Sequence, residues 1–212
     1  LDLARCYYSE LVRSAADFVH HGPSEALLNK LGDRIEKSHL VVPGGGSLQQ
    51  MVIQYAASLK KFVEQRKSAL FPCGWRLHAV YCEVFQQGVE YNLFVYNSGD
   101  GSNTNHFAVS TDGIETDKQS PVLVFKGIPQ KVLFHPTQLR ALIEGHVSSY
   151  YSGSIMTGPA TMYSVALGRL GDYLDKESST AVMMDGQLGG TCLLSGLHHF
   201  VHYWVRSLPG LS

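Results

Sequence analysis

The residues best suited to chemistry stand near the C-terminal end, where a glycine-rich run leads into a cysteine. Gln187 lies five residues before Cys192, and Thr191 immediately precedes that cysteine. Apolar residues after Cys192 recur at three- and four-residue steps, which predicts a helix over 193–204 with Thr191 as its N-cap. Cys192 would then occupy the first turn, where unpaired N–H groups and the positive dipole end favour a thiolate. We therefore predict a nucleophilic cysteine, with the Gln187 amide as a donor to the resulting oxyanion.

A cysteine nucleophile needs a base, and a predicted β-hairpin supplies one. Two aromatic and β-branched segments, 75–85 and 91–96, flank a turn centred near Gly88. His78 lies ten residues before Gly88, and Asn97 and Ser98 lie nine and ten residues after it, so we expect His78 to face Asn97 or Ser98. Directly opposed residues bring their Cβ atoms to about 4.5–5.5 Å. Asn97 would accept a hydrogen bond from one ring nitrogen of His78 and fix its tautomer, leaving the other nitrogen for the thiol.

Two alternatives compete with this interpretation. His106 follows the loop 97–103 and could be the base instead, with Asp100 or Asn103 as its orienting partner, because loops often carry catalytic residues. His78 has the better-defined partner and is the preferred candidate. The cysteine also has a purely structural explanation, because a lone cysteine at a helix start is usually a small buried apolar side chain.

The order of these residues resembles one group of enzymes. The order is a histidine at a strand start, an Asn at the end of the next strand, and a Gln shortly before a helix-opening Cys. This order resembles that of the adenovirus-protease-like superfamily of cysteine peptidases. That superfamily includes ubiquitin-like-protein proteases and bacterial effector deubiquitinases. The resemblance covers roughly residues 75–208. It implies four catalytic residues: His78, Asn97, Gln187 and Cys192.

The resemblance implies a thiol protease or isopeptidase, a hydrolase acting at the C-terminus of ubiquitin or a ubiquitin-like modifier, with no cofactor. Such modifier tails end in Gly-Gly, so we expect a narrow groove with Trp75 as one wall. Yop-type acetyltransferases use the same catalytic set and are one alternative. A non-catalytic protein-binding module is another. The resemblance to bacterial effector enzymes implies, as one alternative for a cytoplasmic location, a secreted bacterial protein that acts in the host cytoplasm.

Composition narrows the possible partners. The chain has 212 residues and a formal net charge of -1, so no strong field favours nucleic acid or an anionic membrane. No apolar run is long enough to span a bilayer. The four cysteines form no CxxC pair and the ten histidines no ligand pattern, so we expect no metal site. Free thiols in a reducing, cytoplasmic compartment are expected. Because the chain begins at Leu1, we expect a domain of a longer protein.

The elements that must position these residues predict an α+β fold, with an antiparallel sheet flanked by helices. The resemblance implies a papain-like, ubiquitin-like-protease-like core over 71–212. A helical N-terminal region, 1–70, precedes it. Its helices are predicted at 1–21, 23–38 and 48–66, the last capped by Ser47. This helical region could help to bind a partner or could cover one face of the sheet, and we favour the second. Beyond the hairpin we predict strands at 107–110, 122–125 and 131–134, and helices at 137–145 and 161–174.

Overall fold

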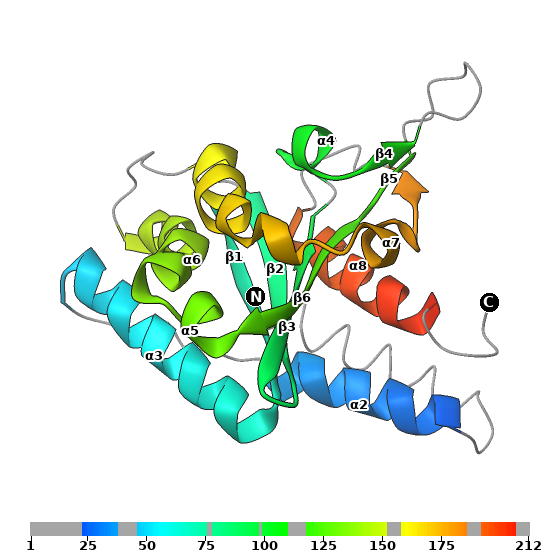
Figure 1. Ribbon diagram of the computed structural model, residues 1–212, viewed down its shortest axis with the longest axis horizontal. Coiled ribbons are helices and arrows are strands. Elements are labelled where there is room, and N and C mark those ends of the chain that lie inside the picture. The colour runs from blue at the N-terminus through cyan, green and yellow to red at the C-terminus, as the bar shows by residue number, and fades with distance from the viewer. Residues whose placement is uncertain are drawn as a thin grey trace.

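The computed structural model describes seven stretches of the chain and has an α+β architecture (Figure 1). The described residues are 23–37, 46–75, 78–97, 99–109, 118–151, 158–185 and 192–206. Four antiparallel strands form the main sheet, in the order β1 (Ser68–Trp75), β2 (His78–Gln87), β3 (Glu90–Tyr96) and β6 (Val122–Pro129). The predicted class, an antiparallel sheet flanked by helices, is confirmed.

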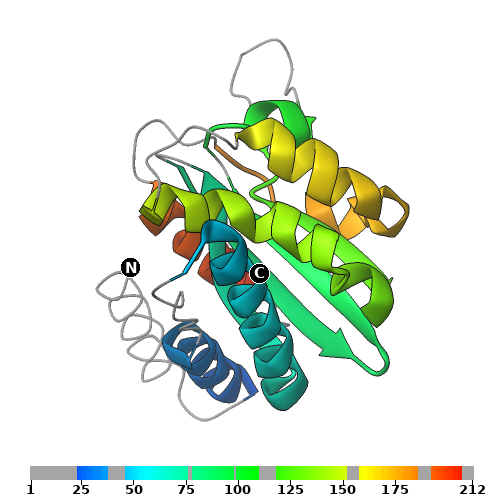
Figure 2. The same cartoon turned by 90° about the vertical axis from the view of Figure 1, so that its left-hand side faces the viewer.

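Helices cover both faces of this sheet (Figure 1, Figure 2). One face packs against α3 (Leu48–Arg66), α6 (Pro136–Tyr151) and the π-helical segment η1 (Thr161–Leu167). The other face packs against α2 (Pro23–Lys37) and α8 (Cys192–Arg206). Successive side chains of a strand point to opposite faces, so the sheet separates two apolar cores.

Short elements complete the described fold. Three two-residue strands form a second sheet: β4 (Ala108–Val109), β5 (Lys118–Gln119) and β7 (Met184–Asp185). The short helices are α4 (Ser102–Asn105), α5 (Gln130–Leu133), the 3₁₀ helix η2 (Gly168–Tyr173) and α7 (Lys176–Thr180).

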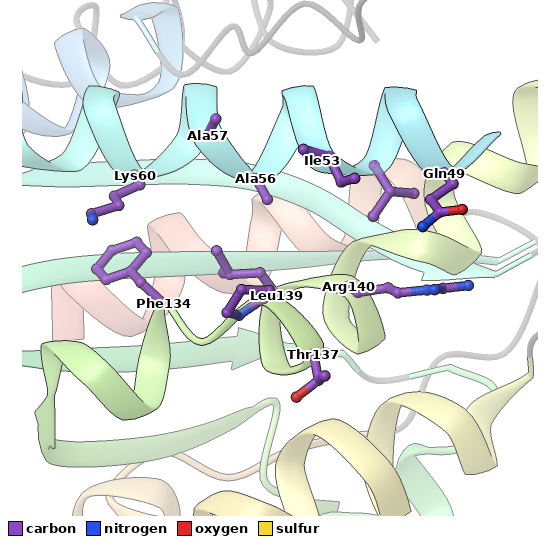
Figure 3. Close-up of a pocket in the computed structure, with 11 residues that line it drawn as sticks. Gln49, Ile53, Ala56, Ala57, Lys60, Phe134, Thr137, Leu139 and Arg140 are labelled. Carbon is purple, nitrogen blue, oxygen red and sulfur yellow. The ribbon is translucent and has the colours of Figure 1, made fainter. Parts of the chain in front are cut away.

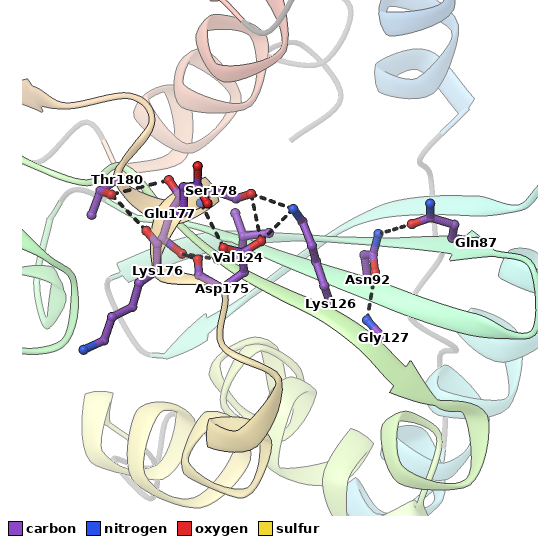
Figure 4. A network of polar contacts seen from close by, with 11 residues as sticks. Gln87, Asn92, Val124, Lys126, Gly127, Asp175, Lys176, Glu177, Ser178 and Thr180 are labelled. Carbon is purple, nitrogen blue, oxygen red and sulfur yellow. Dashed lines mark hydrogen bonds and ion pairs between the residues drawn. The ribbon is translucent and has the colours of Figure 1, made fainter.

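An ion pair and an N-cap, both made by Asp175, hold the start of α7 next to β6 (Figure 4). The Asp175 carboxylate accepts from the Ser178 N–H as an N-cap and forms an ion pair with Lys126 at 2.6 Å. Hydrogen bonds from Lys126 and Ser178 lower the pKa of Asp175 to about 2. The carboxylate is therefore ionised near neutral pH and holds the short helix against the sheet.

The β2–β3 hairpin has a two-residue turn at Gly88 and Val89. Gly88 has φ 64°, and it holds the first central position, where a type II′ turn places glycine. This turn fixes the register, which pairs Gln87 with Glu90 and, at the other end, Tyr81 with Tyr96. The predicted hairpin is confirmed, and its register determines where the candidate catalytic side chains meet.

Helix α3 agrees with its predicted bounds. Ser47 accepts from the N–H of Gln50, and the Gln50 side chain accepts in return from the Ser47 N–H, which completes a capping box. The buried face of α3 shares one core with the sheet, but α2 packs in the other core, so the expectation that the helical region covers a single face is corrected. The predicted boundary between residues 70 and 71 falls inside β1 (Ser68–Trp75).

Three segments differ from the predictions. Residues 68–75 form an unpredicted strand, and its Pro72 is accommodated because β1 is an edge of the sheet. The predicted strand at 131–134 is wrong, because β6 extends to Pro129 and the chain then turns into α5. Residues 161–173 are helical, but with π and then 3₁₀ geometry. The predicted helix at 1–21 lies outside the described residues. Among the described helices, none combines the length and apolar character that crossing a bilayer requires.

Three buried histidines make the stability of this fold dependent on pH. Burial lowers the pKa of His106 and His146 to about 4, and burial together with the neighbouring histidines lowers the pKa of His199 to about 4. An unfolded histidine titrates near 6.5. The unfolded chain therefore binds more protons between pH 6.5 and 4, so stability is complete above this window and is lost as pH falls through it.

We predict that the free energy of unfolding falls by roughly 1 kcal/mol per pH unit for each of these histidines across that window. Urea titrations followed by circular dichroism between pH about 7 and about 4.5 measure this slope. His146→Gln should give a shallower slope, because one fewer proton is taken up on unfolding. Gln54→Ala, a change at an exposed side chain of α3 that does not titrate, should leave the slope as in the wild type; equal slopes in all three proteins would contradict the prediction.

Candidate active site

The predicted nucleophile begins a helix, as expected. Helix α8 starts at Cys192 and runs for 15 residues. The first turn of a helix this long carries unpaired N–H groups and the positive end of the dipole. Gln187 and Thr191, the predicted oxyanion donor and N-cap, lie outside the described residues.

The contacts of α8 fix its direction along the sheet. Gly196 lies against the Tyr81 ring, so closely that an added Cβ would come within 2.6 Å of a ring carbon. Two turns later, the Trp204 indole N–H donates to the Glu83 carboxylate at 3.0 Å. Since Tyr81 precedes Glu83 on β2, α8 runs in the same direction as β2. Cys192, one turn before Gly196, therefore lies at the end of the sheet where β2 begins with His78.

His78 and Asn97 meet at that end of the sheet. His78 Nε2 lies 2.9 Å from Asn97 Oδ1, within hydrogen-bond distance. The pairing is diagonal, not directly opposed as predicted: the register that pairs Tyr81 with Tyr96 sets Asn97 opposite Val80, two residues from His78. Diagonal neighbours share a face and are within reach of long side chains. The predicted contact is present, and the predicted opposition is corrected.

The buried Asn97 amide uses its full hydrogen-bonding capacity. Its Nδ2 donates to the carbonyl of Asp100 at 2.9 Å and to the Tyr163 hydroxyl at 2.8 Å. Its Oδ1 accepts from the Gly99 N–H at 3.0 Å and faces His78 Nε2. A flipped amide would set donor against donor at Gly99 and acceptor against acceptor at Asp100, so one orientation is selected.

This orientation determines the tautomer of His78. A carbonyl oxygen can only accept, so His78 Nε2 carries the proton and donates it to Asn97 Oδ1. In the neutral ring Nδ1 is then the basic nitrogen, and it has no hydrogen-bond partner among the described residues. His78 is half-buried. The arrangement can accept a proton at Nδ1 while holding the ring in place.

Trp75 supports the imidazole. Its ring lies 4.8 Å from the His78 ring, centroid to centroid, and its indole N–H donates to the Asp100 carboxylate at 3.0 Å. Trp75 is 7% exposed, and the groove that it was expected to wall remains a prediction. Gly74 lets the two strands approach, because its φ is 108° and a Cβ there would lie 2.4 Å from the His78 carbonyl oxygen.

The two halves of the candidate site approach the sheet from different faces. Trp75 and Tyr163 belong to the core under α3 and α6, whereas α8 packs on the opposite face. Cys192 therefore begins α8 on the face of the sheet opposite to the core that holds Trp75 and Tyr163.

His106 is engaged elsewhere. It is 7% exposed, its Nδ1 lies 2.9 Å from the Ser120 carbonyl, and its Nε2 lies 2.9 Å from the Tyr163 hydroxyl. Asp100, one of its predicted orienting partners, bonds Trp75 instead. Both ring nitrogens are thus occupied inside the core, which favours His78 over His106 as the base.

The other described thiols have a structural environment. Cys73 and Cys82 are free and buried, with their sulfur atoms 3.0 Å apart. Burial, together with Cys73, raises the pKa of Cys82, which disfavours its thiolate. Within the described ranges, no group of three or more His, Cys, Asp or Glu side chains could hold a metal ion.

A groove between α3 and α6 lies apart from these residues (Figure 3). Its volume is about 370 Å³, and its lining is mostly apolar, with Ile53 and Leu139 inside and Lys60 and Arg140 among its polar members. Neither His78 nor any other predicted catalytic residue lines it. The groove therefore adds no reactive group to the candidate site.

Tyr163 is the residue that sequence reasoning missed. It lies 66 residues after Asn97, in η1, and its hydroxyl connects Asn97 to His106. The one sequence signal for such a role is general: a tyrosine on a buried helical face needs a polar partner for its hydroxyl.

Of the predicted catalytic residues, His78 and Asn97 are in contact, and Cys192 begins α8 at the same end of the sheet. Their catalytic roles remain predictions. Comparisons of the chain with protein-family models, curated proteins and solved structures found no significant match.

The hydrogen-bond pattern predicts that Asn97→Asp is costly although it changes one atom. A carboxylate has no proton for the Asp100 carbonyl, which would face it as a second acceptor. We expect a loss of about 2–3 kcal/mol in the free energy of unfolding, measured by urea titration at neutral pH.

Asn92→Asp is the matched control. Asn92 is also buried, but its Nδ2 donates to Gln87, an exposed side chain whose amide can turn to donate instead. The cost there should be much smaller. Equal losses in the free energy of unfolding at the two positions would show that the Asp100 carbonyl does not require the Asn97 amide as its donor.

Proposed function

We propose that the chain is a cysteine peptidase or isopeptidase that hydrolyses bonds at the C-terminus of ubiquitin or a ubiquitin-like modifier. The observation that carries the proposal is the His78–Asn97 hydrogen bond, which leaves Nδ1 of His78 without a partner among the residues that the structure describes. Cys192 begins α8 at that end. Histidine, asparagine and a helix-opening cysteine are the parts that such chemistry requires.

The first chemical step forms the acyl-enzyme. His78 Nδ1 takes the thiol proton of Cys192, and the thiolate attacks the carbonyl carbon of the scissile amide. The C=O electron pair moves to oxygen, where backbone N–H groups at the start of α8 and the Gln187 amide would stabilise the charge. The tetrahedral species collapses, the C–N bond breaks, and His78 gives its Nδ1 proton to the leaving amine.

The second step releases the product. A water molecule gives a proton to His78 Nδ1 and attacks the thioester carbon. Collapse breaks the C–S bond, leaving a carboxylic acid on the modifier, and the proton returns to the Cys192 sulfur. Asn97 serves without a negative charge, because the thiolate and the imidazolium form an ion pair of their own.

The modifier as substrate comes from the resemblance in residue order, and activity-based probes test it. The probes are ubiquitin and ubiquitin-like proteins that carry a C-terminal electrophile. One of them should label the wild-type chain covalently. Cys192→Ala should abolish labelling, and His78→Ala should reduce it at least 100-fold, by analogy with loss of a catalytic base. The control is His198→Ala, an exposed histidine on α8.

A second measurement does not depend on the modifier. An ordinary cysteine thiol has a pKa of about 8.5 and reacts with iodoacetamide only as the pH approaches that value. We predict that Cys192 reacts well below it. In His78→Ala its reactivity should shift toward 8.5, while the buried Cys73 and Cys82 stay unreactive in the folded protein. If Cys192 of the wild type reacted with iodoacetamide only as the pH approached 8.5, the proposed peptidase activity would be refuted. Transfer of an acetyl group from acetyl-coenzyme A to Cys192, without probe labelling, would favour the acetyltransferase alternative.

A further inference from the structure

Tyr163 lies at the centre of a buried chain of hydrogen bonds behind the candidate site. Its hydroxyl is 2.8 Å from Asn97 Nδ2 and 2.9 Å from His106 Nε2. The other nitrogen of His106 lies 2.9 Å from the Ser120 carbonyl. Tyr163 and His106 are 6% and 7% exposed, so neither can exchange these partners for water without opening the core.

The direction of each hydrogen bond in this chain follows from its ends. The Ser120 carbonyl can only accept, so His106 Nδ1 donates to it. Burial lowers the pKa of His106 to about 4, so the ring is neutral near pH 7 and its Nε2 is an acceptor. The Tyr163 hydroxyl therefore donates to Nε2, and its oxygen accepts from Asn97. Every donor meets an acceptor, from Ser120 to His78.

We propose that Tyr163 and His106 are positioning residues that hold the Asn97 amide in one orientation and so keep His78 in the Nε2–H tautomer. The hydroxyl of Tyr163, with the Asp100 carbonyl, satisfies the two amide protons of Asn97. With these protons fixed, Oδ1 can face only the ring nitrogen of His78 and the Gly99 N–H. The consequence for catalysis rests on the proposed function, whereas the tautomer does not.

The backbone around Tyr163 is built to bring it to the loop after β3. Gly101 has φ 77°, and a Cβ there would lie 2.9 Å from Pro159 Cβ and 3.2 Å from a Tyr163 ring carbon. Only glycine allows this approach without a shift. The tyrosine itself lies in a π-helical segment, whose Gly168 N–H bonds the Tyr163 carbonyl. Such segments are rare and occur often at functional sites.

The test replaces the hydroxyl alone. In Tyr163→Phe, nitrogen NMR shifts of the His78 ring should report a smaller fraction of the Nε2–H tautomer, and the Nε2 proton should exchange with water roughly tenfold faster, as the loss of about one hydrogen bond's free energy implies. Tyr91→Phe is the matched control, because Tyr91 is a buried tyrosine of the same core near the far end of the sheet. It should leave both readouts unchanged.

His106→Gln is the second variant, used in addition because Tyr163→Phe could impair folding. A glutamine can offer one donor and one acceptor, so it should retain more of the tautomer than His106→Leu, which offers neither. An unchanged His78 tautomer and exchange rate in folded Tyr163→Phe or His106→Leu would overturn the proposal.

Turnover separates this proposal from the proposed function. With a substrate identified by the probes, Tyr163→Phe should lower kcat by roughly 10- to 100-fold and leave KM nearly unchanged, the range typical of residues that orient a reacting group from behind. If no probe reacts but the tautomer responds as expected, the positioning role stands and the peptidase fails. If the probes react and the tautomer does not respond, the peptidase proposal stands and the positioning role of Tyr163 fails.

Discussion

The amide of Asn97 is the interaction on which the candidate site depends. It is the point where the hairpin, the loop after β3 and η1 converge, and all of its donors and acceptors are matched within 2.8–3.0 Å. An amide in a low-dielectric interior is costly unless it is satisfied, and a satisfied one allows few alternative arrangements. The structure thereby converts a side chain with two nearly equivalent ends into a fixed support for an imidazole.

The sheet is the second constraint, because it separates the His78–Asn97 pair from the helix that begins with Cys192. The His78 imidazole is supported from the core under α3 and α6, whereas α8 packs on the other face. Glu83, fully buried, accepts from both Tyr96 and Trp204 and so sets the position of α8 along its axis. A shift of α8 by one turn would move its first residue, Cys192, by about 5.4 Å, so this carboxylate determines where the start of the helix lies.

Local patterns predicted much of the frame. Alternation and the turn at Gly88 gave the hairpin, Ser47 and the apolar stripe gave α3, and the run after Cys192 gave α8. These features depend on neighbours within a few residues, where propensity and periodicity are strong. The contact between His78 and Asn97 followed from hairpin symmetry, although a two-residue turn made it diagonal.

Long-range pairing explains what the sequence did not reveal. The strands of the second sheet are two residues long, too short to show a hydrophobic periodicity. Strand β1 was not predicted because it contains Pro72, and a proline is tolerated in a strand only at the edge of a sheet, a position that the sequence does not reveal. Tyr163 is invisible for the same reason: its role depends on Asn97 and His106, which are 66 and 57 residues away. π-Helical geometry also has no simple residue pattern.

The distance in sequence between Tyr163 and the hairpin has a consequence for biosynthesis. During translation the strands that carry His78 and Asn97 emerge well before η1, and non-local contacts form only after the intervening chain has been ordered. A ribosome-bound chain that ends near residue 150 has its hairpin but lacks the hydroxyl that completes the hydrogen-bond chain. The hydrogen-bond chain behind Asn97 is thus completed only after η1 has been synthesised, and Cys192 follows later still.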